Sequence, residues 1–191
     1  IERFTRNLEV NPAIGEQKTL VILVNSQSNQ QQPITKEQAS EFVFDLENEY
    51  SVNSYMNEVS YGKTYLTGEV KGWYTISVPE SQLCNVALQR AIAAADNEVD
   101  YRNFNRLVIA HPFNRFCTYG GFASLGLQTL STRDGNVALS FNVLNGVESF
   151  LGGVSKHEFG HGLGLMHASL YDCENGIQNG NCQSIIYGDR E

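Results

Sequence analysis

The chain has 191 residues, of which 41% are hydrophobic, and its formal net charge is −8. This length and composition are typical of one globular domain with a hydrophobic core. The negative charge argues against nucleic acid or an anionic membrane as a partner, and no apolar run approaches the ~20 residues that a membrane-spanning helix needs.

Strands and helices are predicted to alternate in the first half of the chain. The apolar run Thr19–Val24 predicts a strand that is buried on both faces. A capping box at Thr35–Gln38 predicts the start of a helix, and apolar residues at helical spacing predict a second helix over 51–59. Residues 62–77, rich in Tyr, Thr and Val, predict a strand or a bent hairpin, and a long helix is expected over 80–98.

The second half of the chain is expected to complete a β-α-α-β-α-β-β-β-α order. Leu107–Ala110 predicts another buried strand, and the alternating apolar residues of 137–141 predict a further one. The glycine-rich segment 118–131 is weakly patterned and is expected to hold one strand. Asn145 and Glu148 have the spacing that can cap the last helix.

This last helix runs into the sequence H-E-F-G-H-G-L-G-L-M-H, which begins at His157 and ends at His167. Positions i and i+4 lie on one face of a helix, so His157 and His161 can offer imidazole nitrogens to one metal ion. Gly164 permits a positive φ, which ends the helix and turns the chain back. That reversal can bring His167 to the same ion.

Glu158 directly follows the first of these histidines, where it can act as a general base on a water molecule. Three protein ligands leave a fourth position for water, as in catalytic zinc sites. The alternative is a helix with incidental histidines and a glycine cap, which explains neither Glu158 nor the third histidine. The motif therefore predicts a zinc-dependent endopeptidase.

The pattern H-E-x-x-H-x-x-G-x-x-H resembles the zinc motif of the metzincin metalloproteases. Ser60–Gly62, Gly120–Gly126, Leu151–Lys156 and Tyr187–Asp189 lie where similar segments occur in gametolysin-type peptidases and their bacterial relatives. The resemblance implies an α+β, zincin-like fold. Its parts are a twisted five-stranded mixed sheet with one antiparallel edge strand, a long active-site helix and backing helices.

The resemblance also implies a division of the chain. Residues 1–17 are polar and unpatterned and are expected to form an N-terminal arm, residues 18–167 to form the N-terminal catalytic subdomain, and residues 168–191 to begin a C-terminal subdomain. Metzincins carry a methionine turn after the third histidine, and no methionine follows His167. Either the chain is the N-terminal part of a longer or nicked protein, with a C-terminal fragment as its partner, or the turn is absent. We favour the first reading.

By the same resemblance, a protein or peptide substrate lies extended along the edge strand of the sheet. This places the expected substrate-binding residues at Gly121, Phe122, Ala123, Ser124 and Leu125. Two other functions are considered: a secreted zincin-fold binding or adhesion module without turnover, and a metal-dependent amidase that acts on a non-protein substrate. Glu158 argues against the binding module, because a purely structural metal site needs no base.

Four cysteines allow three pairings, and none has the C-x-x-C spacing of a cysteine zinc site or a redox pair. Cys173 and Cys182 flank a Gly/Asn-rich loop, and a disulfide there would hold a segment with little apolar content. Cys84 and Cys117 would then form the second bridge, and four free thiols are the alternative. Disulfides imply an oxidising setting, so the protein is expected to be secreted.

His111 is the one histidine outside the zinc motif, and Pro112 follows it at the end of a predicted strand. We expect a structural role for His111. A role beside the metal ligands or toward substrate is the alternative.

Overall fold

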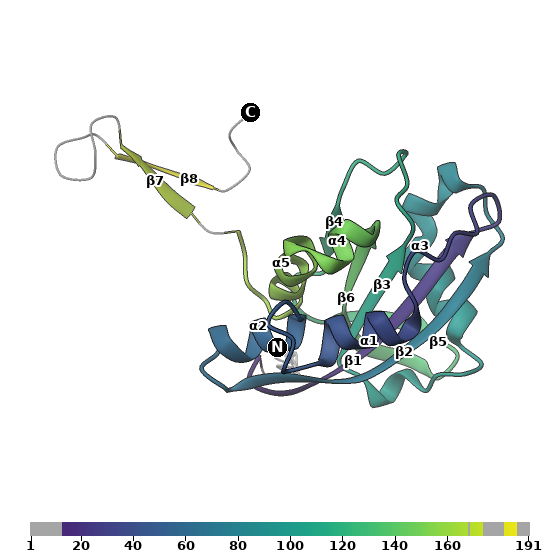
Figure 1. Cartoon of the computed structure of the whole chain (residues 1–191), viewed down its shortest axis with the longest axis horizontal. Helices are drawn as coiled ribbons and strands as arrows, with labels where there is room; N and C mark the ends of the chain where they lie inside the picture. Colours follow the sequence, from purple (N-terminus) through teal and green to yellow (C-terminus); the bar gives the residue numbers. More distant parts are fainter. Residues whose placement is uncertain (1–12, 168, 174–181, 187–191) are drawn as a thin grey trace, which may run out of the picture.

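The computed structural model describes residues 13–167, 169–173 and 182–186. Within these residues the fold is α+β, with a mixed six-stranded sheet, five α-helices and a separate two-stranded hairpin (Figure 1). The sheet strands are β1 (Gly15–Ser26), β2 (Thr64–Ile76), β3 (Arg106–His111), β4 (Gly121–Ala123), β5 (Gln128–Thr132) and β6 (Gly135–Asn145). The helices are α1 (Lys36–Phe44), α2 (Val52–Val59), α3 (Glu80–Ala95), α4 (Val147–Leu151) and α5 (Gly153–Gly162), with a 3₁₀ turn at Tyr101–Asn103.

The sheet has the strand order β2-β1-β3-β6-β4, and β5 also pairs with β6. The first four strands of this order are parallel, whereas β4 and β5 run antiparallel to β6. The expectation of five strands is therefore wrong, because segment 118–131 contains one strand and begins another. β6 is eleven residues long, so its first half can pair with β5 while Asn142–Leu144 pairs with β4.

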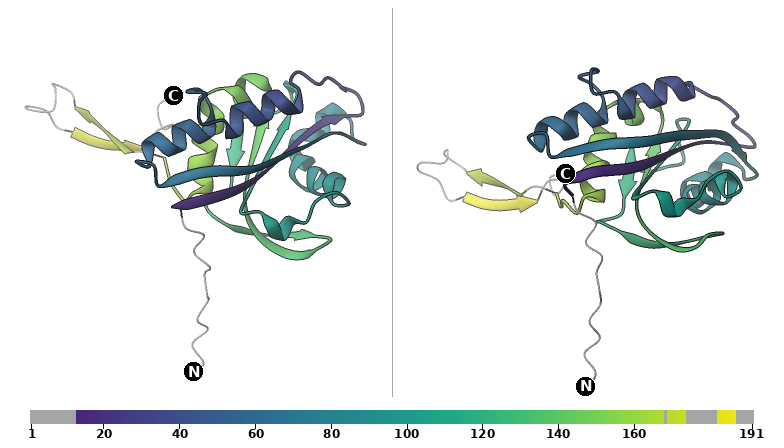
Figure 2. Two further views of the ribbon diagram at one scale, coloured as in Figure 1. Left: turned by 60° about the horizontal axis from the view of Figure 1, so that its bottom comes forward. Right: turned by 90° about the horizontal axis from the view of Figure 1, so that it is seen from below.

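Helices cover both faces of the sheet (Figure 2). A hydrophobic core lies between the sheet and the helices on each face. Side chains alternate between the two faces of a strand, so Leu20, Ile22 and Val24 pack with α3. Val21 and Leu23 point the opposite way and pack with α1, α2, α4 and α5. All five side chains are 0% exposed, which confirms the prediction of a strand buried on both faces.

Two glycines in β2 let its backbone come close to β1. A Cβ at Gly68 would lie 1.7 Å from the carbonyl oxygen of Thr19, and a Cβ at Gly72 would lie 2.2 Å from that of Leu23. The register between the two strands shifts next to Leu23, and the indole of Trp73 donates to the carbonyl of Ile34 at 3.0 Å. Segment 62–77 is thus one continuous strand with a local irregularity rather than a hairpin.

The predicted helix starts were right for α1, α2 and α3 and wrong for the last predicted helix. Thr35 forms the expected capping box with Gln38, and Ser51 caps α2. The last predicted helix begins with α4, after Gly146 and without a side-chain cap, and Gly152 divides it into α4 and α5. A Cβ at Gly152 would lie 2.5 Å from the carbonyl oxygen of Glu148.

The structure agrees with one predicted disulfide and leaves the other as a prediction. Cys84 and Cys117 are bonded, with their Cα atoms 5.3 Å apart. The hairpin of β7 (Ser169–Cys173) and β8 (Cys182–Ile186) places Cys173 opposite Cys182 in register, but their side chains lie outside the described part of the chain. This hairpin extends away from the sheet and its helices (Figures 1 and 2).

The predicted segment boundaries differ in part from the structure. β1 begins at Gly15, so the last residues of the expected arm belong to the sheet, and Gln17 is fully buried. Residues 1–12 and Tyr187–Asp189 lie outside the described residues.

Among the helices that the structure describes, we find none whose length and apolar character would let it cross a bilayer.

Candidate metal centre

The candidate site is built on α5 and on the turn that follows it. The helix ends at Gly162, and Gly164 adopts a φ of +97°, as its place in the motif predicts. The amide of Gly164 donates to the carbonyl of His161 at 2.8 Å, and the amide of Leu165 donates to that of Gly160 at 3.0 Å. These bonds satisfy carbonyls at the helix end and reverse the chain, which brings His167 back to the helix.

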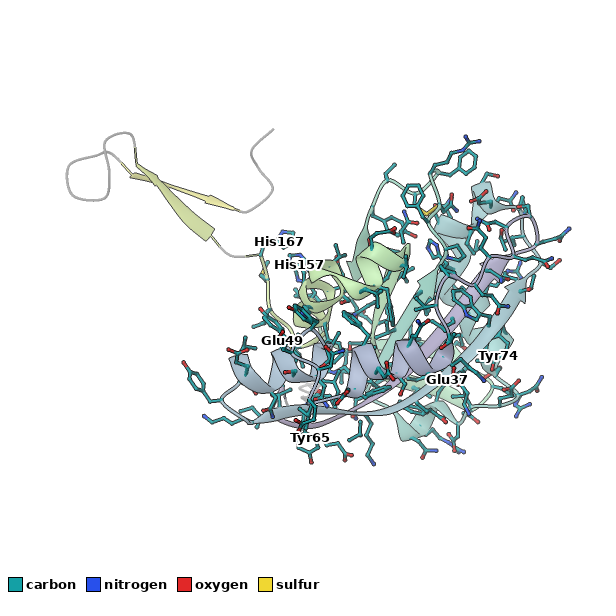
Figure 3. The ribbon with its side chains drawn as sticks, viewed as in Figure 1. Glu37, Glu49, Tyr65, Tyr74, His157 and His167 are labelled. Carbon is teal, nitrogen blue, oxygen red and sulfur yellow. A yellow bond between two sulfur atoms is a disulfide. The ribbon has the colours of Figure 1, made fainter. Side chains whose placement is uncertain are left out.

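The structure brings His157, His161 and His167 together in a position to bind one metal ion (Figure 3 labels the first and the last). Nε2 of His157 lies 3.1 Å from Nε2 of His161 and 3.3 Å from Nε2 of His167. Nitrogen ligands at about 2.0–2.1 Å from a tetrahedral zinc ion would lie roughly 3.3–3.4 Å apart. The three imidazoles therefore fit a tetrahedral metal ion of the size of zinc.

Hydrogen bonding and electrostatics favour the neutral, metal-binding form of two of these imidazoles. Nδ1 of His161 lies 2.7 Å from the carbonyl oxygen of Leu165, so Nδ1 carries the proton and Nε2 keeps a free lone pair toward the site. The pKa of His157 is lowered by burial and by the neighbouring His161 and His167. A lowered pKa favours the neutral imidazole, which is the form that binds metals.

Glu158 is buried and shares a cavity with the first of the three histidines. It is 7% exposed and, with His157, lines a cavity of about 390 Å³ between α5 and the start of β4. Burial raises the pKa of its carboxyl, and the nearby His161 lowers it in part. A Cβ at Gly121 would lie 2.8 Å from Val154 and 2.9 Å from Cγ of Glu158, so glycine at this position lets β4 approach the helix.

Short polar side chains of β6 anchor α5 against the sheet. In the orientation that satisfies its amide, Asn142 donates to the carbonyl of Glu158 at 3.3 Å and accepts from the amide of Phe159 at 3.2 Å. A Cβ at Gly162 would lie 3.0 Å from Oγ of Ser140, so the helix and β6 are in close contact. The hydrogen bonds of Asn142 hold the backbone of α5 at Glu158 in place.

Arg106 is a residue of the site that the sequence did not reveal. It is 2% exposed, and its guanidinium donates to Gln17 at 2.9 and 2.6 Å, to Ser140 at 3.0 Å and to the carbonyl of Gly162 at 2.7 Å. Burial lowers the pKa of Arg106 to about 10, so it remains charged at neutral pH. The only signal in the sequence is an arginine placed directly before the apolar run of β3.

β4 lies at one end of the sheet, next to α5, as expected for an edge strand. The carbonyl of Gly120 and the amide of Ser124 bond to β6, and alternate residues of a strand face the same neighbour. The backbones of Gly121 and Ala123 therefore face away from β6. Ser124 has a structural role, since its hydroxyl donates to the carbonyl of Gly126 and accepts from the amide of Phe141, whereas Leu125 is 51% exposed.

His111 ends β3 and is 1% exposed. Its Nδ1 lies 2.9 Å from the carbonyl oxygen of Pro112, and its Nε2 has no hydrogen-bonding partner among the described residues. Burial lowers the pKa of His111. It does not belong to the cluster of potential metal ligands found in the described part of the chain.

No protein-family model matches this sequence, and no curated protein matches it. The resemblance to metzincins thus depends on the histidine motif and the short segments around it.

Proposed function

We propose that the protein is a secreted zinc-dependent endopeptidase of the metzincin type, which hydrolyses peptide bonds in extracellular proteins or peptides. The observation that carries this proposal is that the buried residue Glu158 lines the same cavity as His157, one of the three histidines positioned to bind a metal ion. The disulfide between Cys84 and Cys117 supports an oxidising environment.

The ligand set favours a catalytic site over a structural one. Structural zinc sites normally fill all four positions with protein, whereas catalytic sites leave one position open. In the described part of the chain, the cluster of potential ligands consists of His157, His161 and His167. A bound zinc ion would supply Lewis acidity, which polarises a scissile carbonyl and acidifies water.

The residues of the chain supply the remaining parts of the reaction. Glu158 accepts a proton from the attacking water as the oxygen bonds to the carbonyl carbon, and returns it to the leaving nitrogen as the C–N bond breaks. The products are a carboxylic acid and an amine. The outward-facing backbone of Gly121 and Ala123 can pair with an extended peptide and hold its scissile bond over the helix.

A comparison of Glu158→Gln and His161→Ala tests this proposal. With purified protein, zinc and denatured casein, Glu158→Gln should keep the metal but lose about 10²–10⁴-fold in activity, because the amide cannot accept the proton. His161→Ala should lose zinc as measured by metal analysis. Glu41→Gln, an exposed position on α1, is the matched control and should retain both.

The outcomes separate the proposal from its alternatives. A zinc-loaded wild-type protein that cleaves no protein or peptide would contradict it and favour a binding module or an amidase on another substrate. Near wild-type turnover by Glu158→Gln would remove this residue from the mechanism.

A further inference from the structure

A second, larger cavity lies beside the one at Glu158. Its volume is about 720 Å³, and Gly120 lines both cavities, so the two are neighbours at the start of β4. The loop between β3 and β4 contributes Phe113 and Tyr119 to its lining, and α4 contributes Glu148 and Ser149. A peptide extended along β4 would place one of its side chains in this space.

The loop that forms one wall of this cavity is held in place by buried bonds. The disulfide ties Cys117 to Cys84 on α3. The amide of Asn114 donates to Oδ1 of Asn145 at 2.7 Å, and Nδ2 of Asn145 donates to the carbonyls of Asn114 at 3.2 Å and Tyr119 at 3.0 Å. Asn114 and Asn145 are only 1% and 4% exposed. The cavity is therefore preformed, which limits the ordering cost of binding.

The lining combines one carboxylate with an exposed aromatic ring. Glu148 is exposed, and neither ion pair found among the described residues involves it. Phe113 is 64% exposed. Oε2 of Glu148 and Cβ of Phe113 each lie 3.2 Å from the position of a Cβ at Gly146, so the carboxylate and the phenylalanine flank the same glycine.

Two cations of the neighbouring segments lie over aromatic rings that do not line this cavity. The guanidinium of Arg115 lies 5.1 Å from the centre of the Phe116 ring, and Nζ of Lys156 lies 5.4 Å from that of Tyr55. A cavity lined by a carboxylate and by aromatic residues is suited to a lysine or arginine side chain, through an ion pair and a cation–π contact.

We propose that this cavity is a substrate subsite for a lysine or arginine side chain close to the scissile bond, with Glu148 as the specificity-determining residue. This inference rests on the proposed peptidase function and names the substrates that it would select. The acidic net charge of the protein, −8, also favours the approach of basic peptides.

The test uses zinc-loaded protein and pairs of peptides that differ only in arginine or citrulline, its neutral isostere, at each position around the cleavage site. At one position, wild-type kcat/KM should be about five- to tenfold higher for arginine, the size expected of a partly exposed ion pair with a cation–π contact. This ratio should fall at high salt, because ions screen exposed charges.

Variants of Glu148 identify the residue responsible. Glu148→Gln should lose the arginine preference, and Glu148→Lys should favour a glutamate peptide at the same position. Glu41→Gln should keep the wild-type ratio. Zinc content and melting temperature confirm that each variant is folded, and the salt dependence of the wild-type ratio tests the charge preference without any variant.

The possible failures are distinguishable. If cleavage depends on Glu158 but shows no preference for arginine at any position, the subsite is overturned and the peptidase function stands. If Glu148→Gln keeps the preference, Glu148 is not its determinant and the assignment fails. If no peptide is cleaved, the proposed function fails and the subsite fails with it.

Discussion

Replacing Arg106 with methionine should weaken both the fold and the metal site. Methionine has a similar length but no donor, so all four hydrogen bonds of the guanidinium are lost. Two of these bonds go to Gln17 on β1, and one goes to the carbonyl of Gly162 at the end of α5. The change therefore removes a direct connection between the central sheet and the turn that carries His167.

The size of the effect follows from the acceptors that lose their donor. Each buried acceptor that is left without a hydrogen bond destabilises the fold by about 1–3 kcal/mol. Part of this loss is offset, because the variant no longer buries a charged guanidinium. We expect the free energy of unfolding to fall by about 2–4 kcal/mol. For a chain of this length, that corresponds to a melting temperature roughly 5–15 °C lower. Zinc affinity should fall about tenfold, the effect typical of residues that support metal ligands.

Thermal unfolding by circular dichroism and competitive zinc titration measure the two effects. Arg102→Met is the matched control, because it removes the same charge from an exposed arginine that bonds only to Asp100 in the described structure, and its melting temperature should match the wild type. A wild-type melting temperature for Arg106→Met would refute the reasoning. A lower melting temperature with unchanged zinc affinity would limit Arg106 to a structural role.

Two further predictions follow from the structure. Replacing Cys84 and Cys117 together with serine should lower the free energy of unfolding by about 3–4 kcal/mol, because the bond closes a loop of 33 residues, and thermal unfolding with and without reductant checks this value. Gly121→Ala should reduce kcat/KM while zinc content stays unchanged, because its Cβ would press on Val154 and Glu158, and peptide assays with metal analysis would detect the loss.

Local sequence patterns predicted the parts of the fold that depend on short-range physics. The apolar run Thr19–Val24 predicted a buried strand correctly, because a strand covered on both faces needs apolar residues at every position. The cap at Thr35 could be recognised because its hydrogen-bonding partners lie within one helical turn. The same holds for the histidine motif, where helical spacing and the positive φ of Gly164 bring the three imidazoles together.

Features that depend on contacts distant in sequence could not be predicted in this way. Asn145 has the spacing of a helix cap, but its amide bonds to Asn114, 31 residues earlier. β4 has three residues, too few to show a period of two, and it pairs only because β6 extends past β5. The sequence analysis makes no prediction for Arg106, and only the fold brings Gln17 and Gly162 to its guanidinium.

Because of the position of His167, a bound metal ion would also influence the orientation of the β7–β8 hairpin. Hydrogen bonds at Gly164 and Leu165 hold the turn after α5, and His167 lies two residues beyond Leu165, at the root of the β7–β8 hairpin (Figure 3). An ion shared by His157, His161 and His167 would act as a cross-link between the helix and this root. Part of its binding free energy would then serve to orient the hairpin, so the holo and apo forms would differ in how the following segment leaves the domain.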